Sequence, residues 1–273
     1  MTEQYNDRYI MSHNPDDAES SRLALLEASF DPNSRQQLLA LGVRAGWRCL
    51  EIGSGRGSMA RWLADQVGPT GHMVAVDINP RFLDAIAAPN IEIRQTNIVT
   101  DELETGAFDL VFCRAVLEHL TEYGRALDRM VAALKPGGLI CIEDGDYSGD
   151  FARVMAASGN PGDAEHFTRT LRHIFQSMEA RGIHNQRLAR RLSLELEARG
   201  LVDVGNVGVV RVSGPADPIT QFAADSMRVI QPMLAAQGIV GEEDMQRMLR
   251  VLEDPALRWV PFTLCCAWGR RPA

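Results

Sequence analysis

The sequence has no excess of basic charge and no long apolar run. Its 28 Lys and Arg residues are outnumbered by 36 Asp and Glu residues, giving a formal net charge of −8. A protein that holds nucleic acid regardless of sequence needs a basic surface to displace counterions from phosphates, so no nucleic-acid partner is expected. The sequence shows neither the run of about 18 apolar residues that a membrane span requires nor an N-terminal apolar segment typical of a signal peptide. We therefore expect a cytoplasmic protein with no membrane partner.

Cysteine is also scarce, and its spacing is uninformative for metal binding. The five cysteines form no CxxC pair and none of the spacings of a zinc site. Cys265 and Cys266 are neighbours in an expected strand, so their side chains should point to opposite faces and could not chelate one metal together. Reduced thiols in the core are the expected state.

A regular alternation of short apolar runs and amphipathic stretches begins near residue 46. This pattern is typical of parallel strands connected by helices. The 273 residues are 45% hydrophobic, which suffices for one large domain, and a single domain spanning 1–273 is expected. The expected strands of its core, residues 46–147, are 48–53, 72–77, 91–95, 108–113 and 139–143.

The alternation lapses after residue 147. One or two helices are expected over 151–183, another helix over 186–199, a strand near 202–212, helices over 216–253 and a last strand near 261–268. We thus expect a helical cap at 1–45 and helical insertions at 148–184 and 214–255, with 185–213 and 256–273 completing the sheet.

A glycine-rich turn follows the first expected strand, in the segment Leu-Glu-Ile-Gly-Ser-Gly-Arg-Gly at 50–57. Backbone N–H groups and the positive end of the next helix can meet a ligand there, because glycine has no Cβ to block the approach. Such turns also occur in dinucleotide-binding proteins, and some merely join two elements. Glu51 lies beside the turn, where a buried carboxylate would need a donor such as an ammonium group.

Two later positions extend this pattern. Asp77 ends the second expected strand, where a carboxylate can accept hydrogen bonds from both hydroxyls of a ribose, a feature that also suits NAD. Asn97 and Ile98 follow the third strand and could meet an adenine edge, although they could also be ordinary loop residues.

Together with Leu-Glu-His-Leu at 117–120 and Lys-Pro-Gly-Gly at 135–138, these motifs resemble the class I S-adenosylmethionine-dependent methyltransferase family. The resemblance covers about 46–147 and is strongest to the small-molecule branch related to quinone-biosynthesis and antibiotic-tailoring enzymes. It implies an α/β, Rossmann-like sheet of seven strands, the last of them antiparallel, with S-adenosyl-L-methionine bound over the strand ends and S-adenosyl-L-homocysteine as product. The implied cofactor contacts are Tyr9, Glu51, Gly53, Ser54, Gly55, Asp77, Ile78, Asn97, Ile98 and Arg114.

Departures from family patterns narrow the chemistry. Cys113 and Arg114 stand where metal-dependent relatives carry an acidic ligand, so no metal is expected. The Asn-Pro-Pro-Tyr type motif of enzymes that methylate amino groups of DNA or glutamine is missing. The family often has Asp at the position of Asn97, whose amide oxygen can still accept a hydrogen bond from adenine.

Several side chains are candidates for handling the methyl acceptor. His119 is a candidate general base, or alternatively a partner of Glu118. Candidates at the tip of the fifth strand are Glu143 and Asp144 for substrate binding and Asp146 and Tyr147 for catalysis, or else they are solvated turn residues.

The expected helices after residue 151 carry His166 and His173, which could contact an anionic or phenolic acceptor or face solvent. The two insertions are expected to close over a small-molecule substrate, form the contact of a homodimer, or do both.

The sequence therefore predicts methyl transfer to an oxygen, nitrogen or carbon of a small metabolite, within specialised biosynthesis. One alternative is a non-methylating reaction such as a cyclisation that uses the same cofactor. A less favoured alternative is an NAD-dependent oxidoreductase, because position 58 is serine where the dinucleotide fingerprint has its third glycine.

Overall fold

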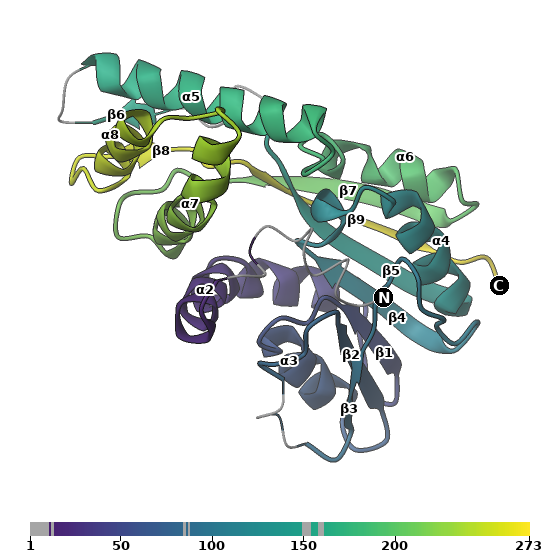
Figure 1. The fold of residues 1–273 in the computed structure, drawn as a ribbon. Helices are drawn as coiled ribbons and strands as arrows, with labels where there is room; N and C mark the ends of the chain where they lie inside the picture. The colour runs from purple at the N-terminus through teal and green to yellow at the C-terminus, as the bar shows by residue number, and fades with distance from the viewer. Residues whose placement is uncertain (1–10, 12–13, 84–85, 87, 149–153, 158–160) are drawn as a thin grey trace.

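A seven-stranded sheet forms the centre of the molecule (Figure 1). The computed structural model describes residues 11, 14–83, 86, 88–148, 154–157 and 161–273. The strand order is β3-β2-β1-β4-β5-β9-β7, and β9 runs antiparallel to both of its neighbours. The strands are β1 (Arg48–Ile52), β2 (His72–Asp77), β3 (Ile91–Gln95), β4 (Phe108–Arg114), β5 (Leu134–Asp146), β7 (Val202–Val210) and β9 (Thr263–Arg270). The expected fold class, including the reversed strand, is confirmed.

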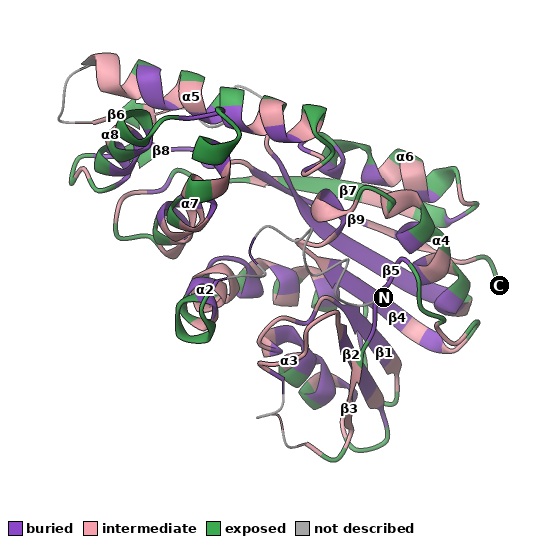
Figure 2. Cartoon of the chain, in the orientation of Figure 1, coloured by how far each residue is buried: buried purple, intermediate pink, exposed green. Residues whose placement is uncertain are grey.

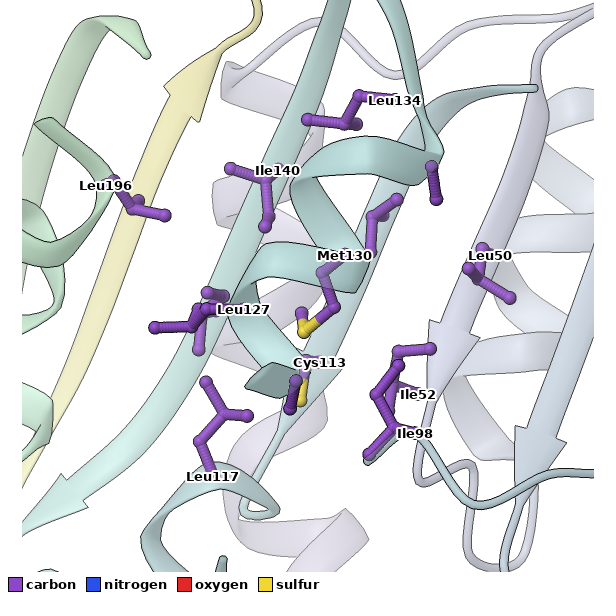
Figure 3. Packing of buried hydrophobic residues seen from close by; sticks show 14 of the residues in the cluster. Leu50, Ile52, Ile98, Cys113, Leu117, Leu127, Met130, Leu134, Ile140 and Leu196 are labelled. Atoms are coloured by element: carbon purple, nitrogen blue, oxygen red, sulfur yellow. The ribbon is translucent and has the colours of Figure 1, made fainter. Parts of the chain in front are cut away.

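Helices bury both faces of the central strands, which explains why these strands are apolar along their whole length. Along β2, Met73 and Ala75 face the helix α3 (Ser58–Val67), whereas Val74 and Val76 belong to the cluster on the other face. That second cluster contains Leu127 and Met130 of α4 (Tyr123–Ala133), which lie against the strands in Figure 3. Figure 2 shows the central strands β1, β4 and β5 as mostly buried, whereas the edge strand β7 is largely exposed.

A separate group of elements forms a cap with its own hydrophobic cluster. The cap contains α5 (Pro161–Ala180), α7 (Pro218–Ala236), α8 (Glu242–Leu252) and a two-stranded sheet of β6 (Val154–Ala156) and β8 (Arg258–Trp259). Trp259 is 1% exposed in this cluster, and its indole N–H donates to Thr220 Oγ1 at 2.8 Å. The long helix α2 (Asp16–Ala40) lies against α7 (Figure 1).

Two expected helical segments differ from the structure. Part of 151–183 is the strand β6, which pairs with β8 across a long sequence separation. The helix expected over 186–199 is the 3-10 turn η2 (Ala189–Arg191) followed by the short α6 (Leu192–Glu197). Residues just before η2 instead bond to the sheet loops: Asn185 N–H donates to the Glu118 carbonyl at 2.7 Å, and the Gln186 carbonyl accepts from Tyr147 N–H at 3.0 Å.

The described helices do not include one that is both long enough and apolar enough to cross a membrane. The five cysteines are all buried and free of disulfides. Cys266 lies 3.5 Å from Cys141, sulfur to sulfur, between two neighbouring strands.

Candidate functional site

A cavity of about 820 Å³ lies over the carboxyl ends of β1, β2, β4 and β5. Helices α2, α5 and α7 enclose it from the other side and also contribute to its lining. In open α/β sheets, ligands bind outside the carboxyl ends of the strands, where loops from several strands meet. The cavity is therefore in the position where the sequence placed a cofactor.

The glycine-rich turn between β1 and α3 lines one part of the cavity. Gly53 and Gly55 have φ of +73° and +54°, a region that side chains with a Cβ rarely adopt. A Cβ on Gly53 would also lie 2.2 Å from Val116 Cγ2. The turn thus requires glycine for its backbone conformation and for close packing, and its own N–H groups at Gly53, Ser54 and Gly55 donate to Val76 and Asp77.

Glu51 is the most unusual group at the turn, because its carboxylate is buried without a complete set of partners. The residue is 4% exposed, and its Oε2 atom has no hydrogen-bond partner among the described residues. Burial raises the pKa of Glu51 to about 8, although the nearby Arg114 guanidinium opposes this shift. Glu51 is among the residues that line the cavity, and a buried carboxylate beside a cavity fits a ligand that brings a positively charged donor such as an ammonium group.

Asp77 connects the second strand to the glycine-rich turn. Its carboxylate accepts hydrogen bonds from Gly55 N–H at 3.0 Å and from Asn79 N–H at 2.9 Å. Because each carboxylate oxygen can accept a further bond, Asp77 can shape the turn and still bind hydroxyl groups. Ile78 lies beside it in the cavity lining.

Asn97 and Ile98 also line the cavity, beyond the end of β3. Asn97 Oδ1 accepts the Val99 N–H at 2.9 Å, and Asn97 N–H donates to Asp101 at 2.9 Å. The oxygen expected to meet adenine therefore already stabilises its own loop, and only its second lone pair remains for a ligand.

Arg114 is tied to α2 rather than pointing alone into the cavity. Its guanidinium donates to Asp31 Oδ1 and to Ser34 Oγ, each at 2.9 Å. Ser34 in turn donates to Glu143, which is 1% exposed at the end of β5. This network joins α2 to β4 and β5, gives Asp31 a counter-charge and gives Glu143 a hydroxyl donor beside the cavity.

A polar cluster, defined here as Glu118, His119, Asp144, Tyr147 and His184, lies in the same cavity. Glu118 Oε1 is 3.5 Å from His119 Nε2 and 4.0 Å from His184 Nε2, and the Glu118 carboxylate accepts Gly145 N–H at 2.8 Å. The Tyr147 ring packs edge-on against His184 with 5.0 Å between centroids. Asp144 Oδ2 and His184 Nδ1 are buried without a hydrogen-bond partner.

Burial suppresses ionisation throughout this cluster. It lowers the pKa of His119 to about 4 and that of His184 well below its usual value, so both imidazoles are neutral at physiological pH. It raises the pKa of Glu118 to about 7. The pKa of Asp144 is raised by burial and by the neighbouring Glu118 charge.

Some candidate residues lie away from the cavity lining. Asp146 is buried in an ion pair with Arg190, N to O at 2.6 Å. His166 is 3.3 Å from Asp244 on α8, and His173 is exposed on the outer face of α5. Tyr9 lies outside the described residues.

Sequence reasoning did not single out His184 as a site residue and treated Glu118 only as a partner of His119. Glu118 had a signal, because it stands in the Leu-Glu-His-Leu segment after the fourth strand. His184 had none, because it reaches the cluster from the loop after α5, at a sequence separation that no local pattern encodes.

Two groups among the described residues bring metal-ligating atom types within 4.8 Å of one another: Glu118, His119 and His184, and Cys141, Glu143 and Cys266. The second group pairs Cys266 with a cysteine of another strand and not with Cys265. The expectation that no metal is required stays a prediction.

The seven-stranded sheet with its reversed strand and the glycine-rich turn after β1 define a Rossmann-like fold of the class I methyltransferase type. Residues 50–142 match a family model described as a methyltransferase domain. A chain in the complex of the Haloferax volcanii Trm112 methyltransferase activator with a methyltransferase shares the fold, with a TM-score of 0.58 at 14% identity over 94% of this chain and 96% of that one.

Two curated relatives narrow the comparison. The ubiquinone/menaquinone biosynthesis C-methyltransferase UbiE of Pseudomonas putida is 37% identical over 109 residues, covering 37% of this chain and 43% of that protein. Methyltransferase str3 of Strobilurus tenacellus is 32% identical over 181 residues, covering 61% of this chain and 64% of that protein. This chain thus spans less than two thirds of the length of either relative, and its residues 50–142 are similar to a methyltransferase domain.

Proposed function

We propose that this protein transfers a methyl group from S-adenosylmethionine to an oxygen, nitrogen or carbon atom of a small metabolite, within specialised biosynthesis. The observation that carries this proposal is the unpartnered, buried Oε2 of Glu51 beside the glycine-rich turn, with Asp77 at the end of the next strand. These two carboxylates suit the two ends of one molecule, the ammonium of its methionyl part and the hydroxyls of its ribose. The name of UbiE agrees with methyl transfer in biosynthesis, and that of str3 agrees with methyl transfer.

Different residues of the chain bind different parts of S-adenosylmethionine in this proposal. Glu51 accepts from the ammonium group, Asp77 from the ribose hydroxyls, and the loop at Asn97 and Ile98 meets the adenine. The glycine-rich turn lets the ligand approach the backbone at Gly53 and Gly55. The bound cofactor supplies an electrophilic methyl group on a sulfonium; the protein supplies position, which is worth up to about 7–11 kcal/mol when two reactants are well oriented.

The polar cluster is the proposed place for the reacting atom of the acceptor. When the acceptor must lose a proton as its new bond to the methyl carbon forms, either Glu118 or His119 takes that proton. Glu118, with a pKa of about 7, is better matched to neutral pH than His119, with a pKa of about 4. A general base of this kind contributes about 10²–10⁴-fold to a rate.

Calorimetry with S-adenosylmethionine and S-adenosylhomocysteine tests the proposal directly. We expect both to bind, and Asp77→Ala to weaken each by more than about 1 kcal/mol, because two charge-assisted hydrogen bonds are lost. Asp77→Asn, which keeps one acceptor oxygen, is the matched control and should lose less. The proposal would be refuted if neither S-adenosylmethionine nor S-adenosylhomocysteine bound. Binding without a gain of one methylene in the product mass would favour a non-methylating reaction.

Three further points belong to the same proposal. The chain acts as a single methyltransferase domain, it acts in the cytoplasm, and it forms a homodimer. Five buried, unbridged cysteines support a reducing compartment. Sedimentation of the purified protein tests the homodimer, and fractionation of the source cells tests the location.

A further inference from the structure

The cap presents an apolar surface to the cavity. Its lining includes Ile174, Phe175 and Met178 of α5, Phe222 and Met227 of α7, and Phe262 before β9. The charged side chains of α5 lie elsewhere on the helix: Arg169, Arg172 and His173 are exposed and are not among the lining residues. The helix thus turns its apolar face toward the ligand and its polar face toward solvent.

Three of the four arginines among the described lining residues are paired with carboxylates. Arg22 pairs with Glu19 at 2.6 Å, Arg56 with Glu27 at 3.1 Å and Arg114 with Asp31 at 2.9 Å, N to O. Arg181, the remaining arginine in the lining, is exposed just after α5 and donates to the Ser177 carbonyl at 3.1 Å.

The carboxylates beside the cavity have fewer partners. Glu51 and Asp144 each have a buried oxygen with none. A buried anion without a counter-charge is costly, so an acidic ligand would bind poorly in this environment.

The polar cluster lines the same cavity as the apolar residues of the cap, so the cavity has a polar region beside its apolar one. Asp144 and His184 are each more than nine-tenths buried, and Asp144 Oδ2 and His184 Nδ1 have no hydrogen-bond partner in the part of the chain that the structure describes. A hydroxyl or amine group that reaches either atom can pair with it, since such a group can both donate and accept.

From this lining we propose that the methyl acceptor is a largely apolar molecule without anionic groups, which places a single hydroxyl or amine in the polar cluster. This inference rests on the proposed function, because it assigns the rest of the same cavity. The cavity volume of 820 Å³ accommodates the cofactor together with an acceptor when each needs a volume toward the lower end of the range of about 300–1,000 Å³ that single ligands occupy.

The test is calorimetric titration of the protein saturated with S-adenosylhomocysteine. The probes are 4-alkylphenols of increasing chain length, the matched 4-alkylbenzoates, which are anionic, and the matched alkylbenzenes, which have no hydroxyl. We expect phenol affinity to rise about fourfold for each methylene, the value for transferring a CH₂ group from water into an apolar site. The benzoates and alkylbenzenes should bind at least about tenfold more weakly than phenols of equal length, because an anion or an unpaired polar cluster is unfavourable.

A variant that introduces a positive charge into the cavity lining provides a second test. Met233→Lys places a cation on a half-buried position of the lining and should raise benzoate affinity about tenfold relative to phenol affinity. Met155→Lys makes the same substitution on an exposed residue outside the cavity and should leave both affinities unchanged.

The possible results distinguish failure of this inference from failure of the proposed methyltransferase function. Benzoates that bind as tightly as phenols, or phenols that fail to bind or gain nothing from chain length, would overturn the inference while bound S-adenosylhomocysteine still supports the function. Failure of S-adenosylhomocysteine itself to bind would overturn both.

Discussion

Individual ionisable residues in this protein are buried mainly where the strands of the sheet end. Glu51, Glu118, Glu143 and Asp144 are each less than 5% exposed, and burial raises the pKa of each. Buried carboxylates of this kind cost stability unless a partner compensates them, and perturbed pKa values cluster at functional sites. Glu51 shows the trade-off most clearly, because its missing partner is the group that the proposed ligand supplies.

Glu51 predicts a pH dependence of cofactor binding. Without ligand its pKa is about 8, so the side chain is protonated at pH 7 and must release that proton to pair with an ammonium group. Affinity for S-adenosylhomocysteine should therefore rise by up to about tenfold per pH unit between pH 6 and 8, with proton release measurable by calorimetry in buffers of different ionisation enthalpy. Glu51→Gln should bind more weakly and lose the pH dependence. An unchanged pH profile in this variant would rule out the role.

Glu51 also predicts a pH-dependent stability of the ligand-free protein. The pKa is higher in the folded protein, about 8, than its ordinary value of 4.5, so folded protein holds a proton that unfolded protein has released between these values. Stability is therefore lost as pH rises through this window. Glu51→Gln should be more stable than the parent by roughly 2–5 kcal/mol above pH 8 and no more stable near pH 4, as measured by urea unfolding. A constant difference across pH would contradict this assignment.

At the scale of elements, the turn after β1 and the docking of α2 determine the geometry of the site. The turn depends on glycine at 53, where both φ and the contact with Val116 exclude a side chain. Helix α2 is held by Arg114, which reaches it from the end of β4. Each of these features can be tested by one substitution.

Gly53→Ala should distort the turn. The positive φ costs an alanine about 1–2 kcal/mol, and the 2.2 Å approach to Val116 forces a further shift. We expect lower stability in thermal unfolding and at least about tenfold weaker binding of S-adenosylhomocysteine. Gly106→Ala is the control, since its φ of +64° is similar but open space surrounds it. Equal effects of the two substitutions on binding would contradict the proposed packing role.

Arg114→Ala separates a structural role from cofactor contact. The Arg114 side chain is 8% exposed and paired with Asp31, which also pairs with Arg35 at 2.9 Å, N to O. Removing one partner of a buried ion pair costs about 3–5 kcal/mol; because Arg35 still pairs with Asp31, we expect a loss below this range, which urea unfolding would detect. Exposed Arg172→Ala is the control and should change stability by less than about 0.5 kcal/mol. Weaker cofactor binding with unchanged stability would instead show that Arg114 acts mainly on the ligand.

At the scale of the whole molecule, the cavity lies between two hydrophobic cores. One belongs to the sheet and its flanking helices, and the other belongs to the cap of α5, α7 and α8 (Figure 1). A ligand that contacts both should couple them, because binding to the folded state stabilises whatever the ligand holds together.

Ligand binding should therefore protect the cap more than the far side of the sheet. At a ligand concentration 100 times Kd the stabilisation is about 2.7 kcal/mol. We expect hydrogen exchange of α5 and α7 to slow when S-adenosylhomocysteine and an alkylphenol are both bound. Helix α4, whose residues do not line the cavity, serves as the internal control. Equal slowing in α4 and α5 would contradict a specific coupling of the cap.

Local patterns predicted those parts of the molecule that local physics controls. The strands at 72–77 and 91–95 were predictable, because apolar runs of this length reflect burial in a sheet. The segments beyond residue 147 were less predictable. Residues 154–156 form a strand only because β8, far along the chain, pairs with them.

The amino-acid sequence alone determined the class of this protein, since the glycine-rich turn, Asp77 and the strand periodicity depend on residues that are close together in the chain. Only the tertiary structure brought His184 to Glu118, joined Arg114 to Asp31 and turned the apolar face of α5 toward the cavity. The physical reason is that these contacts join distant segments, and burial among those segments gives the side chains their charge states and leaves certain polar atoms to a ligand.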